Sequence, residues 1–156
     1  MMYDFEKIVA DVKYFEKTLT KAGGNFQAFI SFEKVCGGTD IAVAKEKIDE
    51  KLPLFVKQRK DEVISIKHDV FVQSFIECLL FRGDRGAGVF MKEKQEVEFR
   101  NKLQAFKKMI KRNFNPFTSD VYIYSPLAFG IFWGFGFLIV SKTENAIYAF
   151  SGGADD

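Results

Sequence analysis

Two segments of the chain repeat apolar residues at spacings of three and four positions, which is the period of an α-helix. The first spans residues 4–22 and places five apolar side chains on one face: Phe5, Ile8, Val12, Phe15 and Leu19. The second spans residues 95–112 and does the same with Phe99, Leu103, Phe106 and Ile110. Each stripe needs a surface that covers it, so we predict two amphipathic helices that pack on a common core.

The last third of the chain alternates bulky and small residues with the period of two that is typical of a β-strand. Residues 121–124 and 146–150 are short β-branched and aromatic runs, and a polar turn at 141–145 precedes the second run. Within residues 127–140 the bulky side chains share one parity, and three glycines share the other: Gly130, Gly134 and Gly136. We predict three strands, the middle one with a bulky face and a bare face, followed by a solvated tail at 152–156.

Other segments have two interpretations. Residues 26–32 suit a strand or a helix, and the alternation of Phe26, Ala28, Ile30 and Phe32 favours the strand. Residues 63–66 are β-branched and strand-like, and a helix is predicted from about residue 41 toward Pro53. Asp69 is placed to cap a helix over 70–81, but this segment is apolar nearly all round, so a buried strand competes with the helix.

These elements predict an α+β fold. The 156 residues fit the size of a single domain that buries its own core, so residues 1–156 are treated as one domain. Apolar residues make up 47% and charged residues 28%, which indicates a folded globular chain. We expect an antiparallel sheet, built mainly from the C-terminal strands and packed against the amphipathic helices at 5–22 and 95–112. Nineteen phenylalanines predict a core of rings in edge-to-face contact.

Residues 121–141 contain no charged side chain, and a run of this length could cross a bilayer as a helix. A tail-anchored membrane protein is therefore one alternative. Pro126 divides the run, and the alternation beyond it favours a sheet, so we favour the sheet. The N-terminal segment has early acidic residues and does not resemble a secretory signal. Together with two cysteines of unpaired spacing, Cys36 and Cys78, this favours a cytoplasmic location with reduced thiols.

Basic residues exceed acidic ones in the middle of the chain, where residues 63–120 contain 11 basic and 7 acidic side chains. Two features present this excess: a glycine-rich loop at 83–88 and the polar face of the helix at 95–112. We expect them to contact a protein partner through Arg85, Arg100, Lys107, Lys108, Lys111 and Arg112. Nucleic acid is disfavoured because Glu93, Glu96 and Glu98 dilute the start of that helix and no aromatic residue lies among its exposed positions.

We predict no catalytic residue, cofactor or metal ligand. The single histidine, His68, precedes Asp69 and could serve Cys78 as a base if the fold brought them together, but nothing in the sequence indicates that it does. One histidine and two distant cysteines do not make a zinc motif. Neither glycine-rich segment, 37–38 or 83–88, matches a phosphate-binding or dinucleotide-binding pattern.

The function that this sequence favours is a non-enzymatic protein-binding module. A bacterial immunity protein or antitoxin, which neutralises a toxin by covering it, is one example of that type. A small enzyme or ligand-binding domain with a pocket lined by Phe and Tyr is the alternative from a different class, and the tail-anchored membrane protein is a third. The sequence predicts neither the identity of the partner nor the oligomeric state.

Overall fold

The computed structural model describes residues 4–22, 26–51, 63–83, 88–128, 130 and 132–155. These residues form four α-helices, five strands and one short 3₁₀ helix, η1. In chain order the elements are α1 (Phe5–Ala22), β1 (Gln27–Gly37), α2 (Ile41–Lys51), β2 (Val63–Ile66), α4 (His68–Leu80), α5 (Glu93–Asn113), β3 (Ser119–Tyr124), η1 (Ser125–Leu127), β4 (Trp133–Ser141) and β5 (Ala146–Asp155).

The five strands form one sheet in the order β1-β5-β4-β3-β2, and every neighbouring pair is antiparallel. Three of the strands come from the C-terminal third of the chain, and β5 and β4 lie near the middle of the sheet. The predicted α+β fold, with an antiparallel sheet built mainly from C-terminal strands, is therefore confirmed.

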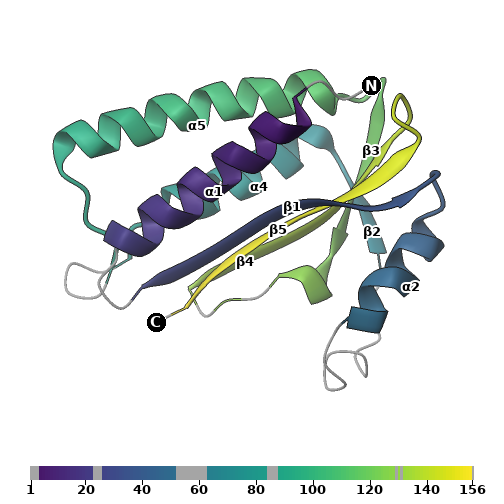
Figure 1. The fold of residues 1–156 in the computed structure, drawn as a ribbon, viewed down its shortest axis with the longest axis horizontal. Coiled ribbons are helices and arrows are strands. Elements are labelled where there is room, and N and C mark those ends of the chain that lie inside the picture. Colours follow the sequence, from purple (N-terminus) through teal and green to yellow (C-terminus); the bar gives the residue numbers. More distant parts are fainter. Residues whose placement is uncertain are drawn as a thin grey trace.

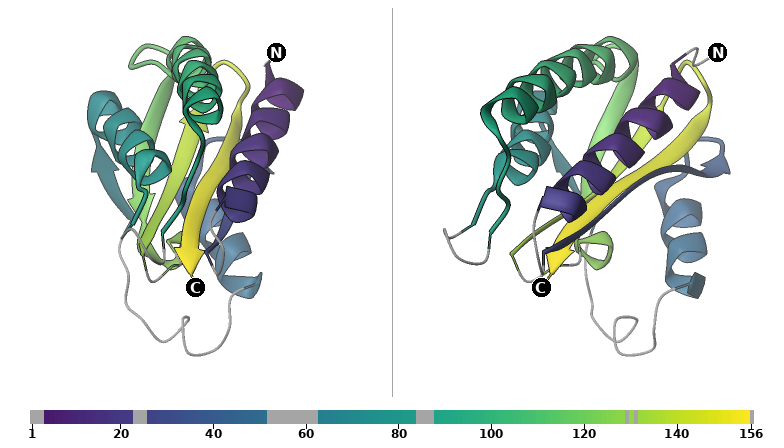
Figure 2. Two further views of the ribbon diagram at one scale, coloured as in Figure 1. Left: turned by 90° about the vertical axis from the view of Figure 1, so that its left-hand side faces the viewer. Right: turned by 60° about the vertical axis from the view of Figure 1, so that its left-hand side comes forward.

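Helices cover both faces of the sheet, but unequally (Figure 1). Figure 2 shows α1, α4 and α5 on one side of the sheet and α2 on the other. The main core lies under the three helices, and a smaller cluster lies under α2 and includes Cys36, Ala44, Tyr124 and Leu138. Because both faces of the central strands are buried, β4 and β5 are apolar on both sides.

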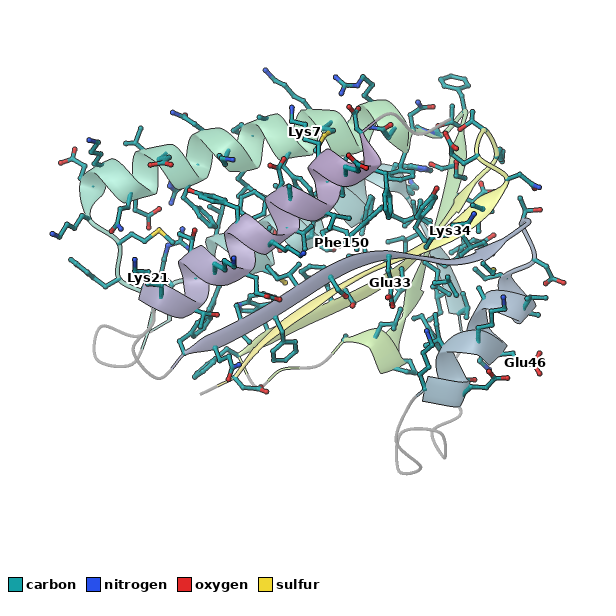
Figure 3. All side chains as sticks on the ribbon, viewed as in Figure 1. Lys7, Lys21, Glu33, Lys34, Glu46 and Phe150 are labelled. Carbon is teal, nitrogen blue, oxygen red and sulfur yellow. The ribbon has the colours of Figure 1, made fainter. Side chains whose placement is uncertain are left out.

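The main core is a stack of phenylalanine rings centred on Phe150 of β5, which is fully buried between the helices and the sheet (Figure 3). Five rings surround Phe150, with centroids 4.9–6.3 Å away and interplanar angles of 61–86°: Phe32, Phe71, Phe75, Phe106 and Phe135. These angles are the edge-to-face geometry that aromatic rings prefer, as predicted.

The two amphipathic helices are confirmed, and all nine apolar positions predicted for them except the half-buried Phe5 are buried. The strand interpretation of residues 26–32 is also correct. The segment 70–81, which suited either a helix or a buried strand, is helical through Leu80 and belongs to α4, with Phe81 as the C-cap. Lys67, not Asp69, precedes this helix, and Asp69 lies in its first turn.

The predicted solvated tail is wrong. Residues 152–155 are the end of β5 and pair with β1 on one side, and residues 152–154 also pair with β4 on the other. Gly152 lies beneath the Phe135 ring, where an added Cβ would come within 2.8 Å of the ring's Cζ. A short run of glycine and alanine thus belongs to the core because it gives the large rings room.

The middle C-terminal strand is shorter than predicted, since β4 begins at Trp133 and the 3₁₀ helix η1 occupies 125–127. The prediction of a strand face without bulky side chains is confirmed at Gly136. There η1 passes over the strand so closely that an added Cβ would lie 2.7 Å from the carbonyl oxygen of Tyr124. Residues 121–141 therefore do not form one helix, and no helix in the described part of the chain is long and apolar enough to cross a membrane.

The outer edge of β1 is covered by polar side chains of α1. The Thr20 hydroxyl accepts a hydrogen bond from the Ala28 amide (3.0 Å) and donates to the Ala28 carbonyl (3.1 Å). One carboxylate oxygen of Glu16 accepts from the Ile30 amide at 2.7 Å. These bonds occupy backbone groups that an edge strand would otherwise offer to another strand.

Candidate functional site

A pocket of about 590 Å³ lies where the start of α4, the end of α5 and the loop 114–118 meet, and we call it the α4–α5 pocket. Its volume is in the range of small-molecule sites. The residues that line it are Lys67, His68, Asp69, Val72, Lys111, Phe114, Asn115 and Pro116.

The pairing of β2 with β3 brings these distant segments together. Ile66 is opposite Val121 in an antiparallel register. Continuing that register places His68, the first residue of α4, beside Ser119, the first residue of β3, and the two side chains form a hydrogen bond of 3.0 Å. The start of α4 is thereby held against the loop that follows α5.

Asn115 organises that loop. Its side-chain oxygen accepts hydrogen bonds from the backbone amides of Phe117 (3.0 Å) and Thr118 (3.2 Å). Its backbone carbonyl accepts from the amide and the hydroxyl of Ser119, both at 2.9 Å. Asparagine commonly closes a turn in this way. The turn places Pro116 at the mouth of the pocket and leaves Phe117 92% exposed.

The hydrogen bonds of Ser119 determine which nitrogen of His68 is free. The Ser119 hydroxyl has one proton and donates it to the Asn115 carbonyl. Its oxygen must therefore accept from His68 Nε2. In neutral His68 the proton is then on Nε2, and Nδ1 has a free lone pair. Nδ1 has no hydrogen-bond partner among the described residues.

The pocket combines apolar walls with a cationic rim. Val72 and Phe114 are buried and form the walls together with Pro116, and Phe114 is the one phenylalanine among the described residues of the lining. Lys67 and Lys111 supply two positive charges, and neither forms an ion pair with a described residue. Among the described residues of the lining one is acidic: Asp69, which is exposed and accepts a hydrogen bond from the Val70 amide. The rim is therefore positive overall.

The predicted basic face of α5 does not form one patch. Lys111 lines the pocket, and Lys107 lies one turn before it on the same side of the helix. Arg112 instead forms an ion pair with Asp4 at the start of α1 (2.5 Å). Hydrogen bonds from Arg112 and then Asn113 lower the pKa of Asp4 from its usual value.

The other predicted contacts are more dispersed. Arg100 lies 3.5 Å from Glu96, which already binds Arg82 at 2.6 Å. Hydrogen bonding to Arg82, followed by the charges of Arg82 and Arg100, lowers the pKa of Glu96 although partial burial opposes it. Lys108 is exposed on the outer side of α5, and Arg85 lies outside the described residues.

The structure does not assemble a cysteine nucleophile with a histidine base. His68 and Cys78 are ten residues apart on α4, which separates them by about 15 Å along the helix axis. Burial, with a smaller effect of Glu77, raises the pKa of Cys78 to about 11, so its thiol stays protonated at neutral pH. Cys36 is buried in the smaller cluster on the opposite face of the sheet, and both thiols are free.

Sequence reasoning found one residue of the pocket among its predicted contacts, Lys111. It missed Lys67, Val72, Phe114 and Pro116 as a group, because they come from segments more than 40 positions apart. The pair Asn115–Pro116 is typical of a turn, and it is the one local indication of this loop in the sequence.

The fold and pocket define an α+β domain with a ligand-sized, positively rimmed hollow at one end of its helical layer. No family model matches the chain, and no curated protein matches it. Two crystal structures of citrus MAF1 are similar to it in overall shape, both at 11% sequence identity. One has a TM-score of 0.49 and covers 91% of this chain and 97% of that chain, and the other has a TM-score of 0.44 and covers 92% and 98%.

Proposed function

We propose that this chain is a non-enzymatic protein-binding module and that its binding surface is the α4–α5 pocket with the exposed side chains beside it. The observation that supports this most is a hollow with apolar walls next to a phenylalanine, Phe117, that is 92% exposed. Burying one such ring in a partner contributes about 1.5–3 kcal/mol. Val70, 45% exposed in the first turn of α4, adds to the apolar area.

This arrangement matches the anatomy of a protein interface. Binding energy at interfaces concentrates in a few apolar anchors seated in pockets, and charges around them govern the rate and selectivity of association. Here the pocket accepts an anchor from the partner while Phe117 supplies one to it. Lys67, Lys111 and the neighbouring Lys107 outnumber Asp69, so the partner that fits is acidic around its apolar anchor.

Substitutions test this proposal, with the full chain used as bait in an extract of its native host. Phe117→Ala removes the projecting ring, and Lys111→Glu reverses one rim charge. The matched controls are Phe90→Ala, which removes a ring that is 76% exposed, and Lys94→Glu, at the opposite end of α5. We expect one protein to be captured by the wild type and both controls and to be lost with Phe117→Ala and Lys111→Glu. Equal capture by all five proteins would contradict the proposal.

The immunity-protein or antitoxin hypothesis is a narrower form of the same proposal. It requires that the partner be a toxin whose activity stops when this surface covers it. Co-expression of the captured partner with the wild type should then protect growth, and co-expression with Phe117→Ala should not. If the captured partner is harmless when expressed alone, the inhibitor hypothesis is wrong although the binding function stands.

A further inference from the structure

We propose that the α4–α5 pocket binds a carboxylate attached to an apolar body, and that His68 takes up a proton as the carboxylate enters. This proposal rests on the proposed function only in that a protein partner would be the source of the carboxylate.

The two cations of the pocket come from different elements. Lys67 immediately precedes α4, and Lys111 lies in the last turn of α5. A carboxylate between them would meet positive charge from both sides. The start of α4 has no side-chain cap from any described residue and is at the same edge, and the positive end of a helix dipole favours an anion there. The two oxygens of a carboxylate can accept charge-assisted hydrogen bonds from ammonium groups and from a protonated imidazole.

The remaining charges around His68 are few. Asp69 is its neighbour on α4, and β2 has no titratable side chain. On β3 the nearest charged residue, Asp120, lies on the other face of the strand from Ser119 and pairs with Lys142 at 3.8 Å. Among the described residues, the charges that face His68 are therefore Lys67, Asp69 and Lys111.

The protonation state of His68 follows from its hydrogen bonds. Nε2 donates to Ser119, whose own proton is committed to Asn115, so Nε2 keeps its proton in either state. In neutral His68 the Nδ1 lone pair would repel a carboxylate oxygen. In protonated His68 Nδ1 becomes a donor and a third positive group. A carboxylate in the pocket therefore favours the protonated form, and binding is coupled to the uptake of one proton.

The apolar body of the ligand has its own place. Val72, Phe114 and Pro116 offer carbon surface, and the volume of about 590 Å³ exceeds what a carboxylate alone would fill. A bare anion such as acetate would leave these walls exposed. The ligand class is thus a carboxylate on an aliphatic or aromatic body, and a small representative is octanoate.

The experiment uses the full chain with octanoate, and with octanamide as a neutral analogue of the same shape. His68 is the one histidine in the sequence, so its ring protons give a single, assignable NMR titration. We expect octanoate to raise the titration midpoint of His68, and its affinity to fall about tenfold per pH unit between the midpoints of the free and the bound protein and to level off above the second one. Between those two midpoints, calorimetry in two buffers of different ionisation enthalpy should show uptake of about one proton per octanoate. Octanamide should bind more weakly and leave the midpoint unchanged.

Three variants make the test specific. His68→Asn keeps a donor for Ser119 but does not titrate, so octanoate binding should persist with little pH dependence. Lys111→Gln should weaken octanoate binding, and Lys94→Gln, at the other end of α5, should not. Thermal unfolding of each variant shows whether it is folded. Absence of octanoate binding, or binding that leaves the His68 resonance unmoved, would overturn the inference.

Phe117→Ala separates this inference from the proposed function, because Phe117 does not line the pocket. That variant should lose the protein partner and keep octanoate binding. Octanoate binding with proton uptake, but no partner that depends on this surface, would leave the pocket chemistry established and the protein-binding function wrong. If a partner depends on this surface but octanoate does not bind with proton uptake, the protein-binding function stands and the proposed pocket chemistry is wrong.

Discussion

The core around Phe150 gives the sharpest test of the fold. Replacing Phe150 with alanine removes a fully buried ring that contacts five others, from β1, α4, α5 and β4. Phe117→Ala deletes the same atoms from a side chain that is 92% exposed. The two variants lose identical chemistry, so any difference between them measures the environment of the ring.

The magnitude follows from burial. A buried Phe→Ala change costs about 3–5 kcal/mol, because transfer energy is lost and a cavity remains. The rings around Phe150 belong to four elements with regular backbones, which limits collapse into the cavity, so we expect the upper half of that range. Phe117→Ala should change the free energy of unfolding by less than about 0.5 kcal/mol.

Urea unfolding at equilibrium, followed by circular dichroism and by fluorescence of the single tryptophan, Trp133, measures both changes. A chain of this size should lose roughly 2–4 °C in Tm per kcal/mol. Since the total stability of a domain is about 5–15 kcal/mol, Phe150→Leu is a milder substitution in case the alanine variant does not fold. If Phe150→Leu and Phe117→Leu lower the free energy of unfolding equally, within error, the placement of Phe150 at the centre of the core is refuted.

Three further predictions concern other parts of the molecule. Replacing Thr20 with valine removes the hydrogen bonds to Ala28, which should lower the free energy of unfolding by about 1–3 kcal/mol. Because this substitution also exposes the backbone at the β1 edge, we expect concentration-dependent self-association in sedimentation velocity, and a variant that stays monomeric with unchanged stability would contradict the role of Thr20. Cys78 should react slowly with iodoacetamide at neutral pH and faster as the pH approaches about 11, and rapid alkylation at neutral pH would count against its raised pKa. Because the pKa of Cys78 is raised from 9.0 in the folded state, the free energy of unfolding should fall as pH rises from about 9 to 11. By NMR, the pKa of the Asp4 carboxyl should lie below its usual range in the wild type and return toward that range in Arg112→Ala, and a normal Asp4 titration in the wild type would exclude the ion pair in solution. The stabilisation that the ionised Asp4 contributes should be lost as pH falls through the lowered pKa.

Local periodicity was enough to predict the elements whose one face is buried. In α1 and in α5 the buried apolar residues recur at spacings of three and four positions, so the sequence alone predicts that both segments are helices. The strand β1 alternates for the same reason, because α1 covers one of its faces.

Elements buried on both sides were harder to predict. Helix α4 is apolar on most of its surface, so its sequence also suited a strand. Only its packing between the sheet and α5 shows that the segment is a helix. The end of β5 looked like a solvated tail because glycine and alanine show no amphipathic pattern. Their burial depends on where Phe135 and Ile30 lie, and neither position can be read from residues 152–155.

The sequence by itself determined the class of fold, the aromatic nature of the core and the basic character of the segment at 63–120, since these depend on composition and on short-range periodicity. The tertiary structure alone decided the strand order and the pocket. The pairing of Ile66 with Val121 brings residues 67–72 to residues 111–116, and α1 draws Arg112 away from the rim that Lys111 lines. The physical reason is that a site built from two distant segments depends on strand register, and register is fixed by the packing of the whole sheet rather than by any local run of residues.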